Sequence, residues 1–187
     1  MENLAKGSKE GENLAAMKWT RENILWSTIM TILAIVCFPV NPLVLTGVLK
    51  TDSYPVLFAL GWAVWAFGMV LVMAPIIMFP RVGGVKKGKA FVSTTRLVDT
   101  GIYSVVRHPQ YLGGILAIFV TTLLWYPHWL FGVLGVMGAV IVYLGAREED
   151  KRLVQKFGDD YVRYMQNVPR MNILAGIVRR LRRPKSE

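Results

Sequence analysis

Long apolar runs, separated by charged or proline-containing segments, dominate the hydrophobic pattern of the chain. Val56–Phe79 contains 24 successive uncharged residues, and at ~1.5 Å per residue a helix of this length exceeds the ~30 Å hydrocarbon thickness of a bilayer. Ile24–Val40 is a second such run, and Tyr111–Tyr126 and Trp129–Ala146, separated by a two-residue corner, are the third and fourth. The pattern predicts four membrane-spanning helices, and a fifth if the short piece Asn41–Leu49 folds back.

Composition and periodicity lead to the same fold class. The chain has 187 residues, of which 53% are hydrophobic, so we predict an all-α protein, a polytopic membrane helical bundle. After the fourth span, apolar residues recur at intervals of three and four. They are Leu153, Phe157, Tyr161 and Tyr164. This spacing predicts a C-terminal amphipathic helix, bent near Gly158.

The same pattern divides the chain into four parts. Residues 1–22 are expected to form an N-terminal cytosolic arm, and residues 23–80 an N-terminal transmembrane part. Residues 81–170 form a C-terminal part with two further spans. Residues 171–187 combine an apolar stripe with several arginines, which predicts a basic tail that rests on lipid headgroups.

The basic residues determine the predicted orientation. With four spans, the N-terminal arm, the loop Arg81–Arg107 and the tail after Ala146 lie on one side and hold 21 of the 22 Lys and Arg residues, whereas Lys50 lies opposite. The positive-inside rule places the basic side in the cytoplasm, which predicts an integral, multi-pass membrane protein with N- and C-termini cytoplasmic. The net charge of +10 reflects this orientation and attraction to anionic headgroups. It does not indicate nucleic acid, because no soluble domain remains to display a binding face.

The segment Gly101–Gly114, where a basic loop enters an apolar helix, is the most informative part of the sequence. Arg107 and His108 stand directly before Pro109, which suits the first helical position because its missing N–H is unpaired there in any case. The N-terminal end of such a helix is positively polarised and binds carboxylate or phosphate groups. At the edge of a bilayer, the segment predicts a site that is reachable from water on one side and from lipid on the other.

Three successive acids, Glu148, Glu149 and Asp150, stand at the cytoplasmic end of the fourth span. Neighbouring residues on a helix point ~100° apart, so at most one or two of these acids face a site. The short corner between the third and fourth spans makes them antiparallel neighbours, which brings Glu149 close to His108. We expect these two side chains to share one pocket, in which the carboxylate takes the ammonium or hydroxyl groups of a small zwitterion.

The sequence also excludes several chemistries. It has no cluster of metal-ligand residues, no glycine-rich dinucleotide fingerprint after a strand and no serine nucleophile elbow. Metal-dependent, redox and hydrolase functions therefore have little support. A transporter is disfavoured because few polar residues occur within the spans.

Two ordered motifs give the chain a resemblance to a known family. The first is Leu97-Val98-x-x-Gly101-Ile102-Tyr103-x-x-x-Arg107-His108-Pro109-x-Tyr111. The second is Glu148-Glu149-x-x-x-Leu153-x-x-x-Phe157-Gly158-Asp159-Asp160-Tyr161-x-x-Tyr164. Together they extend over about Thr95–Arg170 and resemble the isoprenylcysteine carboxyl methyltransferase family, which is related to the membrane phospholipid N-methyltransferases.

The resemblance implies an integral membrane methyltransferase that uses S-adenosylmethionine, held in a cytosolic pocket of the C-terminal part. A membrane lipid or lipidated substrate would enter sideways between helices, and no metal is implied. Carried over by position, the cofactor-binding residues would be Leu97, Val98, Tyr103, His108, Pro109, Gln110, Tyr111 and Glu149. The catalytic residues would be His108, Tyr111 and Arg147.

One departure from the family pattern bears on the methyl acceptor. Prenylcysteine enzymes of this family place an arginine four residues before the glutamate, where it faces the substrate carboxylate. Here that position is Gly145, and the nearest arginine is Arg147. A prenylcysteine-like carboxylate therefore ranks only slightly ahead of a phospholipid amine and a small thiol as acceptor. A non-catalytic membrane protein that retains the cofactor pocket is the alternative from a different class.

Overall fold

The computed structural model of the chain describes residues 44, 47, 49–52, 54–84 and 94–182. Its long elements are α3 (Pro55–Val82), a central helix composed of α4 (Pro109–Gly114), η2 (Ile115–Val120) and α5 (Thr121–Trp125), and α6 (Trp129–Phe157). The short elements are η1 (Gly101–Ser104), α7 (Asp159–Asn167) and α8 (Ile173–Leu181). Every regular element in these ranges is helical, which confirms the predicted all-α class.

The predicted spans are confirmed only in part. Among the described residues, α3 and α6 are long and apolar enough to cross a membrane by length and composition. The central helix, Pro109–Trp125, is apolar but shorter, because a proline begins it and the Tyr126–His128 corner ends it, and at ~1.5 Å per residue it falls short of the ~30 Å hydrocarbon core. The run Ile24–Val40 and most of Asn41–Leu49 lie outside the described residues, so four clear spans are not confirmed.

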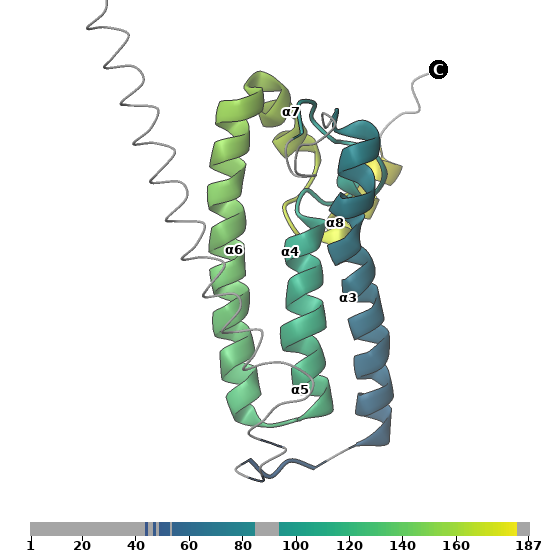
Figure 1. Cartoon of the computed structure of the whole chain (residues 1–187), viewed down its shortest axis with the longest axis vertical. Helices are drawn as coiled ribbons and strands as arrows, with labels where there is room; N and C mark the ends of the chain where they lie inside the picture. The colour runs from purple at the N-terminus through teal and green to yellow at the C-terminus, as the bar shows by residue number, and fades with distance from the viewer. Residues whose placement is uncertain (1–43, 45–46, 48, 53, 85–93, 183–187) are drawn as a thin grey trace, which may run out of the picture.

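The central helix lies between α3 and α6 and packs against both (Figure 1). Its contact with α3 brings backbone against backbone, since a Cβ built on Gly113 would lie 2.5 Å from the carbonyl oxygen of Gly68. Its contact with α6 places the Phe119 ring against Gly138, where a built Cβ would lie 2.2 Å from a ring carbon. Small residues that let helices approach this closely are typical of helix pairs in membranes.

Two buried threonines shape the middle of the central helix. The Thr121 hydroxyl donates to the Leu116 carbonyl, five residues earlier, at 2.9 Å, and the Thr122 hydroxyl donates to the Ile118 carbonyl at 2.6 Å. These bonds satisfy hydroxyl groups that would be costly to leave unpaired in apolar surroundings. The first of them coincides with the π-helical turn of η2, a local widening that often occurs near functional sites.

Polar turns of α6 extend beyond its apolar part and support the end of the bundle. The helix ends at Gly158, whose φ of +59° is readily adopted only by glycine, and the bend predicted there is confirmed. Beyond it, Tyr161, Tyr164 and Val168 of the α7 region form a buried cluster that packs against Leu153 of α6. In Figure 1, α7 and the start of the central helix lie toward the same end of the molecule.

The close contact between α3 and the central helix gives a first testable prediction. We expect Gly113→Ala to lower the free energy of unfolding by ~1–3 kcal/mol, because the added methyl overlaps the α3 backbone. Gly114→Ala is the matched control, since a Cβ there meets nothing within 4 Å, and its better helix propensity makes it neutral or stabilising by up to ~1 kcal/mol. Thermal unfolding in detergent, followed by circular dichroism, compares the two. Equal midpoints would show that the helices do not pack as described.

Candidate cofactor pocket

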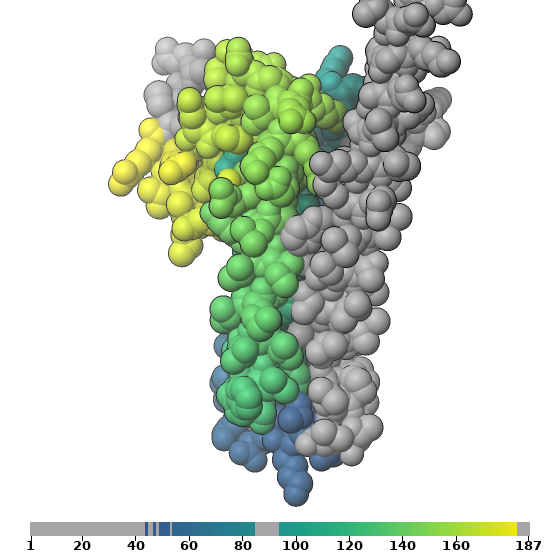
Figure 2. Space-filling model, turned by 90° about the vertical axis from the view of Figure 1, so that its left-hand side faces the viewer, coloured from purple at the N-terminus to yellow at the C-terminus, as the bar shows by residue number. Residues whose placement is uncertain are grey.

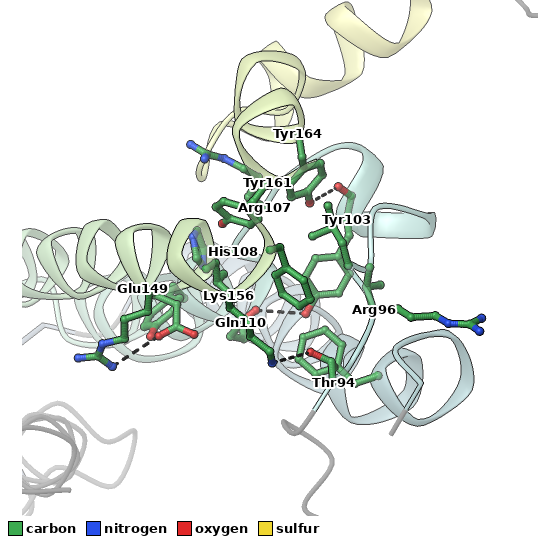
Figure 3. A pocket seen from close by; sticks show the side chains of 17 residues that line it. Thr94, Arg96, Tyr103, Arg107, His108, Gln110, Glu149, Lys156, Tyr161 and Tyr164 are labelled. Atoms are coloured by element: carbon green, nitrogen blue, oxygen red, sulfur yellow. Dashed lines mark hydrogen bonds and ion pairs between the residues drawn. The ribbon is translucent and has the colours of Figure 1, made fainter. Parts of the chain in front are cut away.

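A cavity of about 520 Å³ lies at the end of the bundle where α6 meets α7. Its volume falls within the ~300–1,000 Å³ that is usual for small-molecule sites. The walls come from the last turns of α3, the segment 94–98, the motif residues 103–111, the polar end of α6, and α7. Figure 3 shows most of these side chains grouped around one space, although they come from five separate stretches of sequence.

The Asp150 carboxylate is the polar centre behind this cavity. It is 4% exposed and its Oδ1 accepts from His108 Nε2 at 2.8 Å, Tyr161 Oη at 2.6 Å and Arg107 Nη1 at 3.2 Å. All three donors line the cavity. A buried carboxylate is tolerated only with such charged and hydrogen-bonded partners, and this one holds three walls of the pocket together.

Arg170 completes the network from the segment that follows α7. Its Nε donates to Asp150 Oδ2 at 2.7 Å, and its Nη1 donates to the Tyr143 hydroxyl at 2.8 Å. The backbone of the same segment is also bonded to the motif, because the N–H of Arg107 donates to the Pro169 carbonyl and the N–H of His108 to that of Arg170, each at 3.0 Å. The motif loop is therefore fixed through both its side chains and its backbone.

Helix periodicity explains why Asp150, and not its acidic neighbours, is buried. Asp150 stands four residues after Ala146, which is fully buried, and three before Leu153, which lines the cavity. These residues share one face of α6. Glu148 points to solvent and pairs with Lys151 at 2.7 Å, whereas Glu149 lies between these directions, is partly exposed and lines the cavity.

The lining combines positive charge with aromatic rings. Among the described lining residues, four are Arg or Lys and one is a carboxylate, Glu149. Tyr103 packs its ring 5.3 Å from that of Phe79 and its hydroxyl donates to Gln110 Oε1 at 3.4 Å. The Nε of Arg107 is buried and, alone among the buried side-chain N and O atoms of the described residues, has no hydrogen-bond partner. An unpaired buried donor beside a cavity is suited to an acceptor on a ligand.

Burial and hydrogen bonding shift the ionisation of the groups around the cavity. Burial, reinforced by the hydrogen bond to Asp150, raises the pKa of Tyr161 well above its ordinary value. Burial likewise raises the pKa of Tyr103 and of Tyr164. Burial alone would lower the pKa of Arg170, but the hydrogen bond to Asp150 and its charge outweigh this and raise it. The tyrosines therefore remain neutral donors and Arg170 remains a cation at physiological pH.

Most of the residues predicted from sequence come together in this one cavity. Its lining includes Leu97, Val98, Tyr103, His108, Gln110, Tyr111 and Glu149. Pro109 is buried at the first turn of α4 and is not part of the lining. Arg147 is exposed on α6 and does not line the cavity either. It stands two residues before Glu149, which places it ~160° around the helix from that lining residue.

The sequence did not identify the partner of His108. We expected His108 and Glu149 to share a pocket, and both do line the cavity, but the carboxylate that contacts the imidazole is Asp150. Asp150 could have been recognised by its position one helical turn after Ala146, on the apolar face of the fourth span. Tyr161 was noted in the apolar stripe and in the second motif, but without a role in the site. Arg170 had no recognisable signal, because its role depends on how the chain turns after α7.

Comparison with known proteins places the chain in a family. The model of the phospholipid methyltransferase family matches residues 56–160, more than half of the chain. This chain, with its two long apolar helices and a pocket at their polar end, is thus a member of a membrane methyltransferase family. The chain belongs to the phospholipid methyltransferase family.

The chain is also similar to individual proteins, and in each case the match covers less than half of the relative's length. The chain is 31% identical over 117 residues to methanethiol S-methyltransferase of Pseudomonas deceptionensis, a match that covers 60% of the chain and 42% of the relative. It is 34% identical over 67 residues to methanethiol S-methyltransferase 1 of Bradyrhizobium diazoefficiens, covering 36% and 22% respectively. The chain therefore spans less than half the length of these relatives. No solved structure matches, and the narrower resemblance to isoprenylcysteine enzymes is not confirmed.

The Asp150 network gives a second prediction. We expect Asp150→Ala to lower the free energy of unfolding by ~3–5 kcal/mol, because it leaves buried cationic groups without their partner. Glu148→Gln, two residues earlier on the same helix, removes only an exposed ion pair and should cost less than ~1 kcal/mol. Thermal unfolding in detergent measures both changes. A similar small loss for the two variants would mean that Asp150 is not the buried centre.

A third prediction concerns alkaline pH. In the unfolded chain Tyr161 ionises near its ordinary pKa of ~10, whereas in the folded chain its pKa is raised. Its contribution to stability is thus complete below pH ~10 and is lost as the pH rises above that value. We expect Tyr161→Phe to lower the unfolding midpoint at pH 8 but to reduce its further fall between pH 9 and 11. An unchanged alkaline slope in this variant would contradict the raised pKa.

Proposed function

We propose that this chain catalyses methyl transfer from S-adenosylmethionine to a small thiol within a membrane. The observation that carries the proposal is the cavity in front of the His108–Asp150 contact. Residues of the first motif line one of its walls, and Glu149 lines another. Membership of the methyltransferase family supports the reaction type, and the relatives' name, methanethiol S-methyltransferase, supports the thiol. We further propose an integral membrane protein with the pocket on the cytosolic side, as the basic residues indicate.

The chemistry of the cavity suits S-adenosylmethionine. Glu149 offers a carboxylate for its hydroxyl or ammonium groups, and the unpaired Nε of Arg107 offers a donor for its carboxylate. The ring faces of Tyr103 and Tyr111 suit a positively charged sulfur. When bound, the cofactor supplies a methyl group activated by that sulfur. We propose as its contacts the seven lining residues predicted from sequence, with Arg107 added.

The residues around the cavity would act mainly by charge and by alignment. In the reaction, the thiol sulfur forms a bond to the methyl carbon, the bond from that carbon to the sulfonium breaks, and the thiol proton leaves to water. A thiolate is the reactive form, and cationic surroundings lower the pKa of a thiol, as they do for cysteine. Lys156 on the cavity wall, whose Nζ donates to the Thr94 hydroxyl at 3.4 Å, would provide such surroundings. Arg152 Nη1 lies 3.7 Å from Glu149 Oε2, and Arg96 is exposed and points away from the cavity (Figure 3). His108 is held in one orientation by Asp150 and would position the reactants rather than take the proton.

A small thiol suits this chain better than a prenylcysteine carboxylate. Gly145 occupies the position at which prenylcysteine enzymes place an arginine, and a Cβ built on it meets nothing within 4 Å. Arg147 is exposed outside the cavity and does not replace that arginine, so it is no longer favoured as a catalytic residue. A small thiol is neutral when it enters, so it can reach the site through lipid or water without an arginine that pairs with a substrate carboxylate.

The direct test offers three acceptors to the purified full chain in phospholipid nanodiscs with isotope-labelled methyl donor. Methanethiol should give labelled dimethyl sulfide, which gas chromatography of the headspace detects. Label in a farnesylated cysteine peptide or in phosphatidylethanolamine, with none in dimethyl sulfide, would contradict the thiol proposal and support the carboxylate or amine instead. Label in no product, with S-adenosylhomocysteine still bound, would favour a non-catalytic role.

A fourth prediction compares a residue that lines the cavity with a residue of the same helix outside it. We expect Glu149→Gln to weaken the binding of S-adenosylhomocysteine by ~10-fold or more, because it removes a charged hydrogen-bond acceptor from the wall. Arg147→Gln, on the same helix but outside the cavity, is the matched control and should bind as the wild type does. Isothermal titration calorimetry measures both. If the control weakens binding as much as the pocket variant, the proposed site is wrong.

A further inference from the structure

The short helix α8 exposes its apolar side. Leu174 and Leu181 are 77% and 79% exposed, and Ile177 and Val178 are 42% and 46% exposed. These residues follow the i, i+3, i+4, i+7 spacing that places them on one face. A helix of 9 residues is marginal in water without packing of its apolar face, so this face calls for a partner.

The opposite side of α8 is held against the motif loop. Gly176 is buried, and a Cβ built on it would lie 1.9 Å from the carbonyl oxygen of Val105, two residues before Arg107. Arg179 and Arg180 stand three and four residues after Gly176, so they lie on the side of the helix that faces away from the apolar stripe. The helix therefore lies between the pocket wall and whatever covers the stripe.

The structure indicates lipid as the cover. Leu174 shares an open groove with Phe67 of α3 and with Leu112 and Leu116 of the central helix, so the stripe continues the apolar surface of the membrane helices. Figure 2 shows α8, in yellow, projecting sideways from the upper part of the bundle. An apolar stripe toward lipid with arginines on the other face is the pattern of a helix in the bilayer interface, and the arginines favour anionic headgroups.

We propose that α8 docks on the anionic leaflet of a phospholipid bilayer and thereby fixes the segment Val105–His108, which contributes Arg107 and His108 to the pocket wall. The coupling runs through the Gly176–Val105 contact and through Arg170, which precedes α8 and bonds to Asp150. The proposal does not depend on which acceptor is methylated. It implies that the pocket wall is held more rigidly on anionic than on neutral lipid.

Hydrogen–deuterium exchange of the full chain in nanodiscs tests this docking. In nanodiscs with ~30% phosphatidylglycerol, amides of residues 173–181 and 105–108 should exchange up to ~30-fold more slowly than in pure phosphatidylcholine, as expected for two arginines near anionic lipid. Arg179→Gln with Arg180→Gln should abolish this difference. Arg163→Gln with Lys151→Gln, which also removes two exposed cations, should retain it. Equal exchange in both lipids for the wild type would overturn the proposal.

A second variant tests the coupling itself. In Gly176→Ala the added methyl overlaps the Val105 carbonyl, so the helix can no longer approach the motif loop. We expect lipid charge still to slow exchange in residues 173–181 of this variant, but no longer in residues 105–108. A lipid response of the loop that survives unchanged would show that α8 does not transmit it.

Discussion

The burial of one carboxylate, Asp150, is the constraint on which the rest of the site depends. A charge removed from water must be surrounded by donors, and here the donors come from the motif loop, from α7 and from the segment before α8. Meeting this requirement draws three distant stretches of sequence to the polar end of α6. The cavity is the space that remains between them, lined by the same side chains.

The membrane helices provide the rigid base for this arrangement. Glycine contacts let the central helix approach α3 and α6 closely, and the start of the central helix is where Arg107 and His108 stand. The α6 helix carries Asp150 beyond its apolar part. A shift of either helix along its axis would separate the imidazole from the carboxylate, so packing within the apolar bundle determines the geometry of the polar site.

The sequence predicted the larger features because they follow from simple periodicities. Apolar runs identified α3 and α6, and Gly158 marked the bend. The short corner between the central helix and α6 predicted that His108 and Glu149 share one cavity. Finer features depend on the direction in which each residue of a helix points and on how the chain turns between helices. The difference between Glu149 and Asp150 is ~100° around a helix, and Arg170 reaches the network only because the chain reverses after α7. The apolar run Tyr111–Tyr126 was predicted to span the membrane, but the helix it forms, Pro109–Trp125, is shorter than α3 and α6 because a proline begins it and the Tyr126–His128 corner ends it.

The most direct test of this account is calorimetric titration of S-adenosylhomocysteine into the purified full chain and into its Asp150→Asn variant, below the unfolding temperature of both. Asparagine keeps the size of the side chain but removes the charge that holds Arg107, His108 and Arg170. The account predicts binding to the wild type and a loss of at least ~10-fold in the variant. Equal affinity in the two proteins would contradict it, because the pocket would then not depend on the buried carboxylate.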